Sequence, residues 1–129
     1  MMIVRLGLGI LLATLAMALP AAADGAHGAV GVATKTGFVA FVTGKATQEE
    51  ALAEVEGICT GEGQTCDATK TYENQCAALA RSQDDDTYGV GIEDTPAQAQ
   101  ATALTECTDH KGVGCNIHDT YCSPRSLND

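Results

Sequence analysis

Short apolar runs occur in pairs along this chain, and a polar turn separates the two members of each pair. Residues 28–33 and 38–42 are mostly apolar and lie on either side of the sequence KTG. Residues 77–82 and 87–92 repeat this arrangement around the sequence QDDD. Two runs of this length, divided by a short polar turn, are typical of a β-hairpin. The pattern therefore predicts two hairpins.

A helix is predicted after each hairpin. Residues 47–59 read TQEEALAEVEGIC, and residues 95–107 read TPAQAQATALTEC. Each segment opens on a threonine followed three residues later by glutamate or glutamine, a capping box in which the hydroxyl accepts a backbone N–H. Small and apolar residues then recur at spacings of three and four, as on one face of a helix. Because these faces are narrow and rich in alanine, each helix is expected to lie close to a sheet.

A third strand is predicted after each helix, at residues 67–73 and 116–121, so the order strand, strand, helix, strand occurs twice. Shifting the chain by 48 residues places 28–59 on 76–107 without a gap. One such unit cannot cover its own apolar sheet face, whereas two related by a pseudo-two-fold axis can bury theirs together.

The sequence thus predicts a small α+β domain built from two tandem ββαβ repeats, with about six strands and two helices. The repeat units are expected at residues 28–75 and 76–122, followed by a flexible tail at 123–129.

The first 23 residues are predicted to be a secretory signal peptide. Arg5 precedes an apolar run from Leu6 to Leu19, and Pro20 and three alanines follow. The run of about 14 residues is shorter than the roughly 20 that cross a bilayer. Cleavage after Ala23 would leave a single periplasmic or secreted domain, residues 24–129, without a membrane anchor.

The charge balance favours some partners over others. The chain has 7 basic and 17 acidic residues, and removal of Arg5 with the signal would leave a balance of −11. Such a chain repels phosphate backbones and anionic lipids, which argues against nucleic acids and membrane surfaces as partners. Cationic partners are compatible with this negative charge. They include metal ions, polyamines and a basic protein of the envelope or the extracellular space.

All six cysteines lie beyond the predicted signal peptide, and an even number in a small exported chain predicts disulfides. The spacings fit neither a zinc site of the C-x₂₋₄-C type nor a C-x-x-C redox motif. Because the two repeats should form equivalent disulfides, we expect each helix cysteine to pair with the cysteine that follows it. One further pair then remains. The expected disulfides are Cys59–Cys66, Cys107–Cys115 and Cys76–Cys122.

The chain resembles a bacterial family of exported domains of unknown function, DUF4189. The resemblance covers residues 28–122 and depends on the threonine-capped helices that end in cysteine. Its other specific feature is the nine-residue gap from Cys66 to Cys76, which runs into CAALA at 76–80. The chain lacks the tryptophans and aromatic-rich strands of the family and is more acidic. The resemblance implies export and an α+β fold, and it supplies no catalytic residues.

Histidines near the last cysteine pair are the first candidates for chemistry. His110, His118 and Asp119 could bind copper or zinc in principle. However, a spacing of eight does not place two histidines on one helix face, and His118 and Asp119 point to opposite sides of a strand. No catalytic residue, metal ligand or cofactor site is therefore assigned. Two alternative functions are still compatible with the sequence. One is a metal-binding protein that uses carboxylates, and the other is a small envelope hydrolase or enzyme accessory that uses His110 or His118.

Acidic residues of the second repeat form the candidate interaction surface. Asp84, Asp85 and Asp86 occupy the predicted hairpin turn and lack the EF-hand pattern of a calcium loop. Together with Glu93 and Asp94, they are expected to make one end of this repeat strongly negative. The favoured function is that of a non-enzymatic, acidic binding domain with an unidentified partner.

Overall fold

The computed structural model describes residues 25–128, so the predicted signal peptide lies outside the described residues. The order strand, strand, helix, strand occurs twice, which confirms the predicted α+β fold class. None of the helices within these residues is long and apolar enough to cross a membrane. The elements are β1 (His27–Ala33), β2 (Phe38–Lys45), α1 (Gln48–Gly61), β3 (Ala68–Glu73), β4 (Gln75–Arg81), β5 (Tyr88–Glu93), α2 (Pro96–Asp109), β6 (Asn116–Ser123) and a short 3₁₀ helix (Arg125–Asn128).

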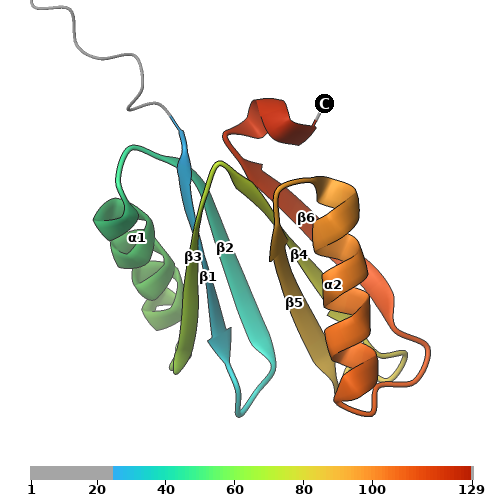
Figure 1. Ribbon diagram of the computed structural model, residues 1–129. Helices are drawn as coiled ribbons and strands as arrows, with labels where there is room; N and C mark the ends of the chain where they lie inside the picture. Colours follow the sequence, from blue (N-terminus) through green and yellow to red (C-terminus); the bar gives the residue numbers. More distant parts are fainter. Residues whose placement is uncertain (1–24, 129) are drawn as a thin grey trace, which may run out of the picture.

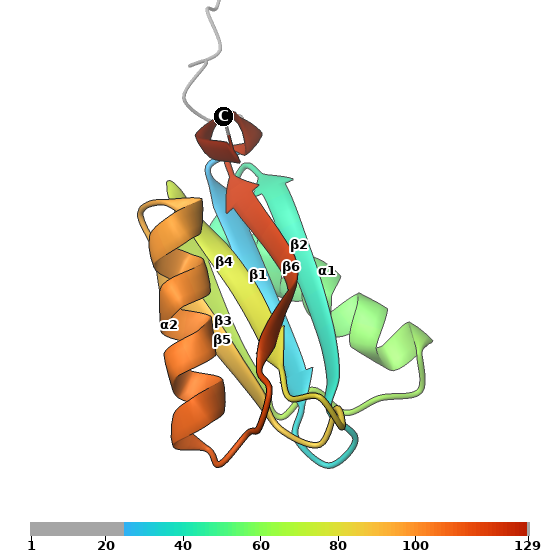
Figure 2. The same cartoon turned by 90° about the vertical axis from the view of Figure 1, so that its right-hand side faces the viewer.

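The strands form two antiparallel sheets of three strands each, in the orders β2-β1-β3 and β5-β4-β6. In both sheets the first strand of the repeat lies in the middle. The sheets face each other, and α1 and α2 cover their outer faces (Figure 1; Figure 2). The apolar residues between the sheets are few, which fits a chain poor in aromatic residues: Val30, Val32, Leu79 and Val90 form the buried centre of this layer.

Each helix begins as its capping sequence predicts. The hydroxyls of Thr47 and Thr95 accept hydrogen bonds from the N–H groups of Glu50 (3.1 Å) and Gln98 (3.2 Å). These bonds satisfy N–H groups that have no partner within the helix. Pro96 occupies the first turn of α2, where it displaces no helical hydrogen bond.

The expected 48-residue shift is correct for the helices but wrong for the strands. In the strands, structurally equivalent residues lie 49 positions apart, as the paired residues Val30 and Phe41 correspond to Leu79 and Val90. Successive strand residues face opposite sides of a sheet, so a one-residue error exchanges the two faces. A shift of 48 would match Val30, between the sheets, with Ala78, which packs in the cluster beneath α2.

Three disulfides join the pairs that the repeat proposes. Cys59–Cys66 and Cys107–Cys115 connect the last turn of each helix to the connection that follows it. Cys76–Cys122 joins residues that lie directly opposite each other in β4 and β6. The equivalent positions in the first repeat are His27 and Glu73, whose side chains approach to 3.7 Å. A contact between two polar side chains therefore occupies the place that a disulfide has in the second repeat.

The segment 123–129, expected to be a flexible tail, is part of the fold as far as Asn128. Ser123 ends β6 and is fully buried, and its hydroxyl accepts the N–H of Gly44 (2.9 Å) and lies 2.5 Å from the carbonyl oxygen of Gly25. Leu127 packs against the core beneath α2. The buried Ser123 and the partly buried Leu127 thus connect this segment to the rest of the fold.

Candidate functional site: a cavity between the sheets

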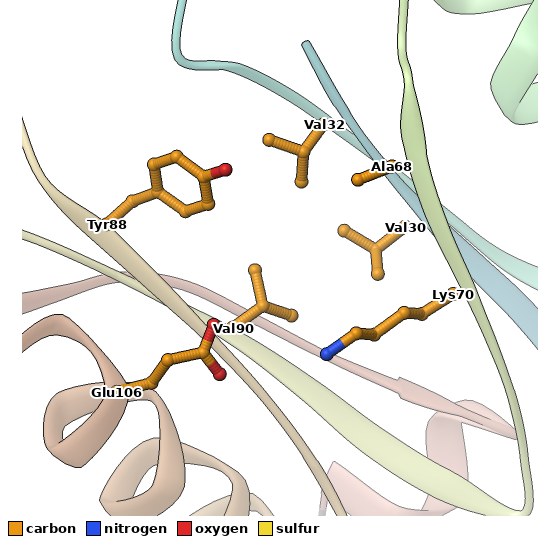
Figure 3. A pocket seen from close by; sticks show the side chains of 7 residues that line it. All are labelled: Val30, Val32, Ala68, Lys70, Tyr88, Val90 and Glu106. Carbon is orange, nitrogen blue, oxygen red and sulfur yellow. The ribbon is translucent and has the colours of Figure 1, made fainter. Parts of the chain in front are cut away.

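The two long sides of the sandwich differ. Between β2 and β6, the rings of Phe41 and Tyr121 lie 5.1 Å apart and contact each other across the two sheets. Between β3 and β5, the sheets leave a cavity of about 100 Å³ (Figure 3). This open side is the candidate functional site.

The cavity has an apolar floor and a charged rim. Val30, Val32 and Val90 form the floor, and Ala68 lies beside them. Lys70 and Glu106 extend from opposite sides of the opening toward each other, as Figure 3 shows. An apolar group inside the cavity would therefore lie beside both a positive and a negative charge.

Residues from both repeats are needed to form this site. The floor and Lys70 come largely from β1 and β3 of the first repeat, whereas Tyr88, Val90 and Glu106 come from β5 and α2 of the second. Alternation along β1 turns Val30 and Val32 toward the second sheet and Ala29 toward α1. Because neither repeat contains all of these residues, the cavity exists only where the two sheets face each other.

The electrostatics around Tyr88 keep its hydroxyl protonated. Partial burial raises the pKa of Tyr88, the carboxylates of Asp67 and Glu106 raise it further, and Arg81 opposes them. The pKa of Asp67 itself is lowered, chiefly because its carboxylate accepts hydrogen bonds from the hydroxyl (2.5 Å) and the N–H (2.8 Å) of Thr34. The surroundings of the cavity thus hold ionised carboxylates and a neutral phenol that can donate a hydrogen bond.

The size of the cavity suits one aliphatic side chain. Pockets for drug-sized molecules usually measure about 300 to 1,000 Å³, well above this volume. A floor of three valines offers van der Waals contact and removal of apolar surface from water. The arrangement can therefore anchor an apolar group of a larger partner and orient its polar neighbours through Lys70 and Glu106.

Comparison with known proteins gives one result. The model of the family described as "Domain of unknown function (DUF4189)" matches residues 27–122, most of the chain. The chain belongs to the DUF4189 family. No curated protein and no solved structure matches it. The resemblance inferred from the helix cysteines is thereby confirmed, and the function has to be argued from the site.

The acidic surface predicted from the sequence of this DUF4189 chain is divided in two. Asp84, Asp85 and Asp86 lie in the turn between β4 and β5, whereas Glu93 ends β5 and Asp94 follows it. A strand of six residues separates the groups by roughly 20 Å. The expectation of a single acidic end is wrong because a hairpin strand carries its two flanking turns to opposite ends of the sheet.

Within the first acidic group, the three aspartates have different roles. The carboxylate of Asp84 accepts hydrogen bonds from the Ser82 hydroxyl (2.5 Å) and the Asp86 N–H (3.2 Å), which lowers the pKa of Asp84. Asp85 adopts a positive φ of 61° and lies 3.9 Å from His118. All three aspartates are exposed, and Asp84 differs from Asp85 and Asp86 in that its carboxylate shapes the turn.

The histidines are dispersed over this DUF4189 fold. His110 caps α2, with Nδ1 3.3 Å from the carbonyl oxygen of Tyr88. His118 lies on β6 beside Asp85, and His27 lies on β1 beside Glu73. Among the residues that the structure describes, no three histidine, cysteine, aspartate or glutamate side chains gather as metal ligands would.

Sequence reasoning missed the cavity, although one signal was present. In the third strand, ATKTYE, alternation places Ala68, Lys70 and Tyr72 on one face. Tyr72 is the bulky apolar residue of that strand and is only 2 % exposed, so this face is the inward one. The alternation therefore indicates a lysine directed toward the core layer.

Proposed function

We propose that this DUF4189 domain is a non-enzymatic binding domain that acts in the periplasm or outside the cell and holds a protein partner at the cavity between β3 and β5. The observation that carries the proposal is a side-chain-sized apolar cavity with Lys70 and Glu106 at its rim. Three disulfides in a chain of this size support an oxidising compartment. The disulfides also restrict the motion of the site. A cavity that is already ordered loses little conformational entropy on binding.

The charge of the protein supports a basic partner. The chain has a formal charge of −10, and Asp67 and Glu106 lie near the cavity. Charge complementarity of this kind accelerates association and disfavours acidic competitors. An aliphatic anchor from the partner would fill the cavity, while its cationic side chains meet the surrounding carboxylates.

Filling the cavity tests this proposal. Ala68→Phe places a ring at the opening without disturbing the buried core, since Ala68 lies at the exposed rim. Ala53→Phe adds the same bulk to the exposed side of α1 and is the matched control. The oxidised chain from Asp24 onward, immobilised, is expected to capture a partner from an envelope extract, as is Ala53→Phe, whereas Ala68→Phe loses it. Capture of every partner by Ala68→Phe would exclude the cavity.

The turn at Asp84–Asp86 is a second candidate contact surface for a basic partner. Its support is the exposure of Asp85 and Asp86 on a turn whose shape Asp84 fixes. Exchange of Asp85 and Asp86 for asparagine removes two charges and keeps the hydrogen bonds of Asp84. Weaker capture by this double variant is the expected outcome, and unchanged capture at low salt would exclude the turn.

A further inference from the structure

One edge of the first sheet has backbone N–H and C=O groups beside the cavity that form no hydrogen bond within residues 25–128. β3 is an outer strand of the sheet β2-β1-β3. Asn74 N–H donates to Ala26 O (2.9 Å) at the end of the β1–β3 ladder. In an antiparallel ladder, hydrogen-bonded pairs alternate with non-hydrogen-bonded pairs. Counting along the register from Asn74, the N–H and C=O groups of Thr69 and Thr71 point away from β1, toward the free edge.

The facing edge strand, β5, carries α2 on its outer face. Cβ atoms added to Gly89 and Gly91 would overlap the backbone of α2, so the helix lies directly on this strand. His110 of α2 lies 3.3 Å from the carbonyl oxygen of Tyr88, on β5. This contact occupies one of the outward backbone groups of β5. Of the two strands that flank the cavity, β3 is therefore the one that we select as the acceptor of an additional strand, because no such contact is made to the outward groups of Thr69 and Thr71 within residues 25–128.

We propose that β3 receives an extended, basic segment of the partner as a fourth strand of the sheet β2-β1-β3. This inference rests on the function proposed above and specifies the partner as an extended peptide. Main-chain hydrogen bonds to Thr69 and Thr71 would supply affinity, and the cavity would select the side chain that faces it. The inward side chains of the added strand lie on the same face as Ala68 and Lys70, at the opening of the cavity.

The charges along β3 define the sequence of this peptide. Lys70 faces inward, and Glu73 lies on the opposite face at the end of the strand. Asp67 directly precedes the strand, and its carboxylate raises the pKa of Tyr88. Aliphatic residues at alternate positions would face the cavity, and lysine or arginine at the intervening positions would complement the carboxylates at the two ends of the strand. The preferred ligand is thus an extended peptide with alternating aliphatic and basic residues.

The experiment measures binding of a short fluorescent peptide of alternating valine and lysine, blocked at both ends, to the oxidised chain from Asp24 onward. Thr71→Pro removes the outward N–H of β3, and an edge strand tolerates proline where its N–H faces solvent. Thr71→Val keeps the N–H and is the matched control. We expect Thr71→Pro to weaken binding by about tenfold and Thr71→Val to bind like the wild type.

Two modified peptides test the same contacts without changing the protein. A peptide N-methylated at alternate residues, which cannot complete the ladder, and a peptide with serine in place of valine should each bind about tenfold more weakly. Equal binding of all three peptides, or unchanged binding to Thr71→Pro, overturns the added strand. If Ala68→Phe still abolishes capture of the partner, the proposed function survives that result. Dimerisation of the free protein that Thr71→Pro abolishes, without peptide binding, would assign the edge to a second copy and overturn the proposal.

Discussion

The carboxylates of Asp84 and Asp67 are held by hydrogen bonds from neighbouring serine and threonine side chains. Each bond favours the ionised form, so the pKa of each aspartate lies below its ordinary value of 3.8. A lowered pKa means that the folded protein binds protons less readily than the unfolded chain. These residues therefore stabilise the fold fully above pH 3.8, and the stabilisation is lost as the pH falls through the lowered pKa.

We expect Asp84→Asn to change how stability depends on pH. Its melting temperature should be lower than that of the wild type at neutral pH, and the difference should shrink below pH 3.8 as the wild-type carboxyl becomes protonated. Melting curves between neutral and strongly acidic pH measure this difference. Asp86→Asn is the control, because its side chain is not part of the bond to Ser82. A difference that stays constant over the whole pH range would contradict this role for Asp84.

At the scale of the elements, α1 and α2 each pack against the outer face of a sheet, but the strand residues beneath the two helices differ in size. On the second sheet, Gly89 and Gly91 let the alanine-rich face of α2 lie directly on β5. On the first sheet, the equivalent strand positions are Ala40 and Val42, which pack beneath α1. Larger strand residues hold α1 farther from its sheet than α2. The glycines of β5 are therefore required by close approach of the helix.

Two glycine-to-alanine variants separate close packing from helix propensity. Gly91→Ala adds a methyl group that overlaps the carbonyl oxygen of Ala99, and we expect a loss of about 2 kcal/mol in the free energy of unfolding. Gly57→Ala lies on α1, where the added atom meets nothing within 4 Å, and should gain about 0.5–1 kcal/mol from helix propensity. Urea unfolding with intact disulfides measures both. A stabilising Gly91→Ala would show that α2 does not rest on β5.

The elements themselves could be predicted from the sequence, whereas the register between the repeats could not. The threonine caps and the helix cysteines mark both helices, and the turns KTG and QDDD mark the hairpins. In β1, however, both faces are buried and apolar, with glycine and valine on one face and alanine and glycine on the other. The alternation that would reveal which face meets the other sheet is therefore weak. An alignment based on the helices thus placed the strands one residue out of register.

At the scale of the whole molecule, duplication produces a site that neither repeat contains. Phe41 and Tyr121 contact each other on one side of the sandwich, and the other side has the cavity lined by Val30, Val90 and Glu106. The depth of this space depends on how two sheets pack, and no residue spacing along the chain records it. Only the inward position of Lys70 could be inferred from sequence alternation. The same packing places the open edge of β3 beside the cavity.

The most direct test of the binding site is a map of backbone amide shifts in ¹⁵N-labelled, oxidised protein during titration with the valine–lysine peptide. We expect the largest shifts at Thr69 and Thr71, which would bond to the peptide backbone, and at the cavity residues Val30, Lys70 and Val90, with smaller changes at the turn around Asp85. Shifts that gather at Asp84–Asp86 and leave the cavity residues unchanged, or no shifts at all, would contradict it.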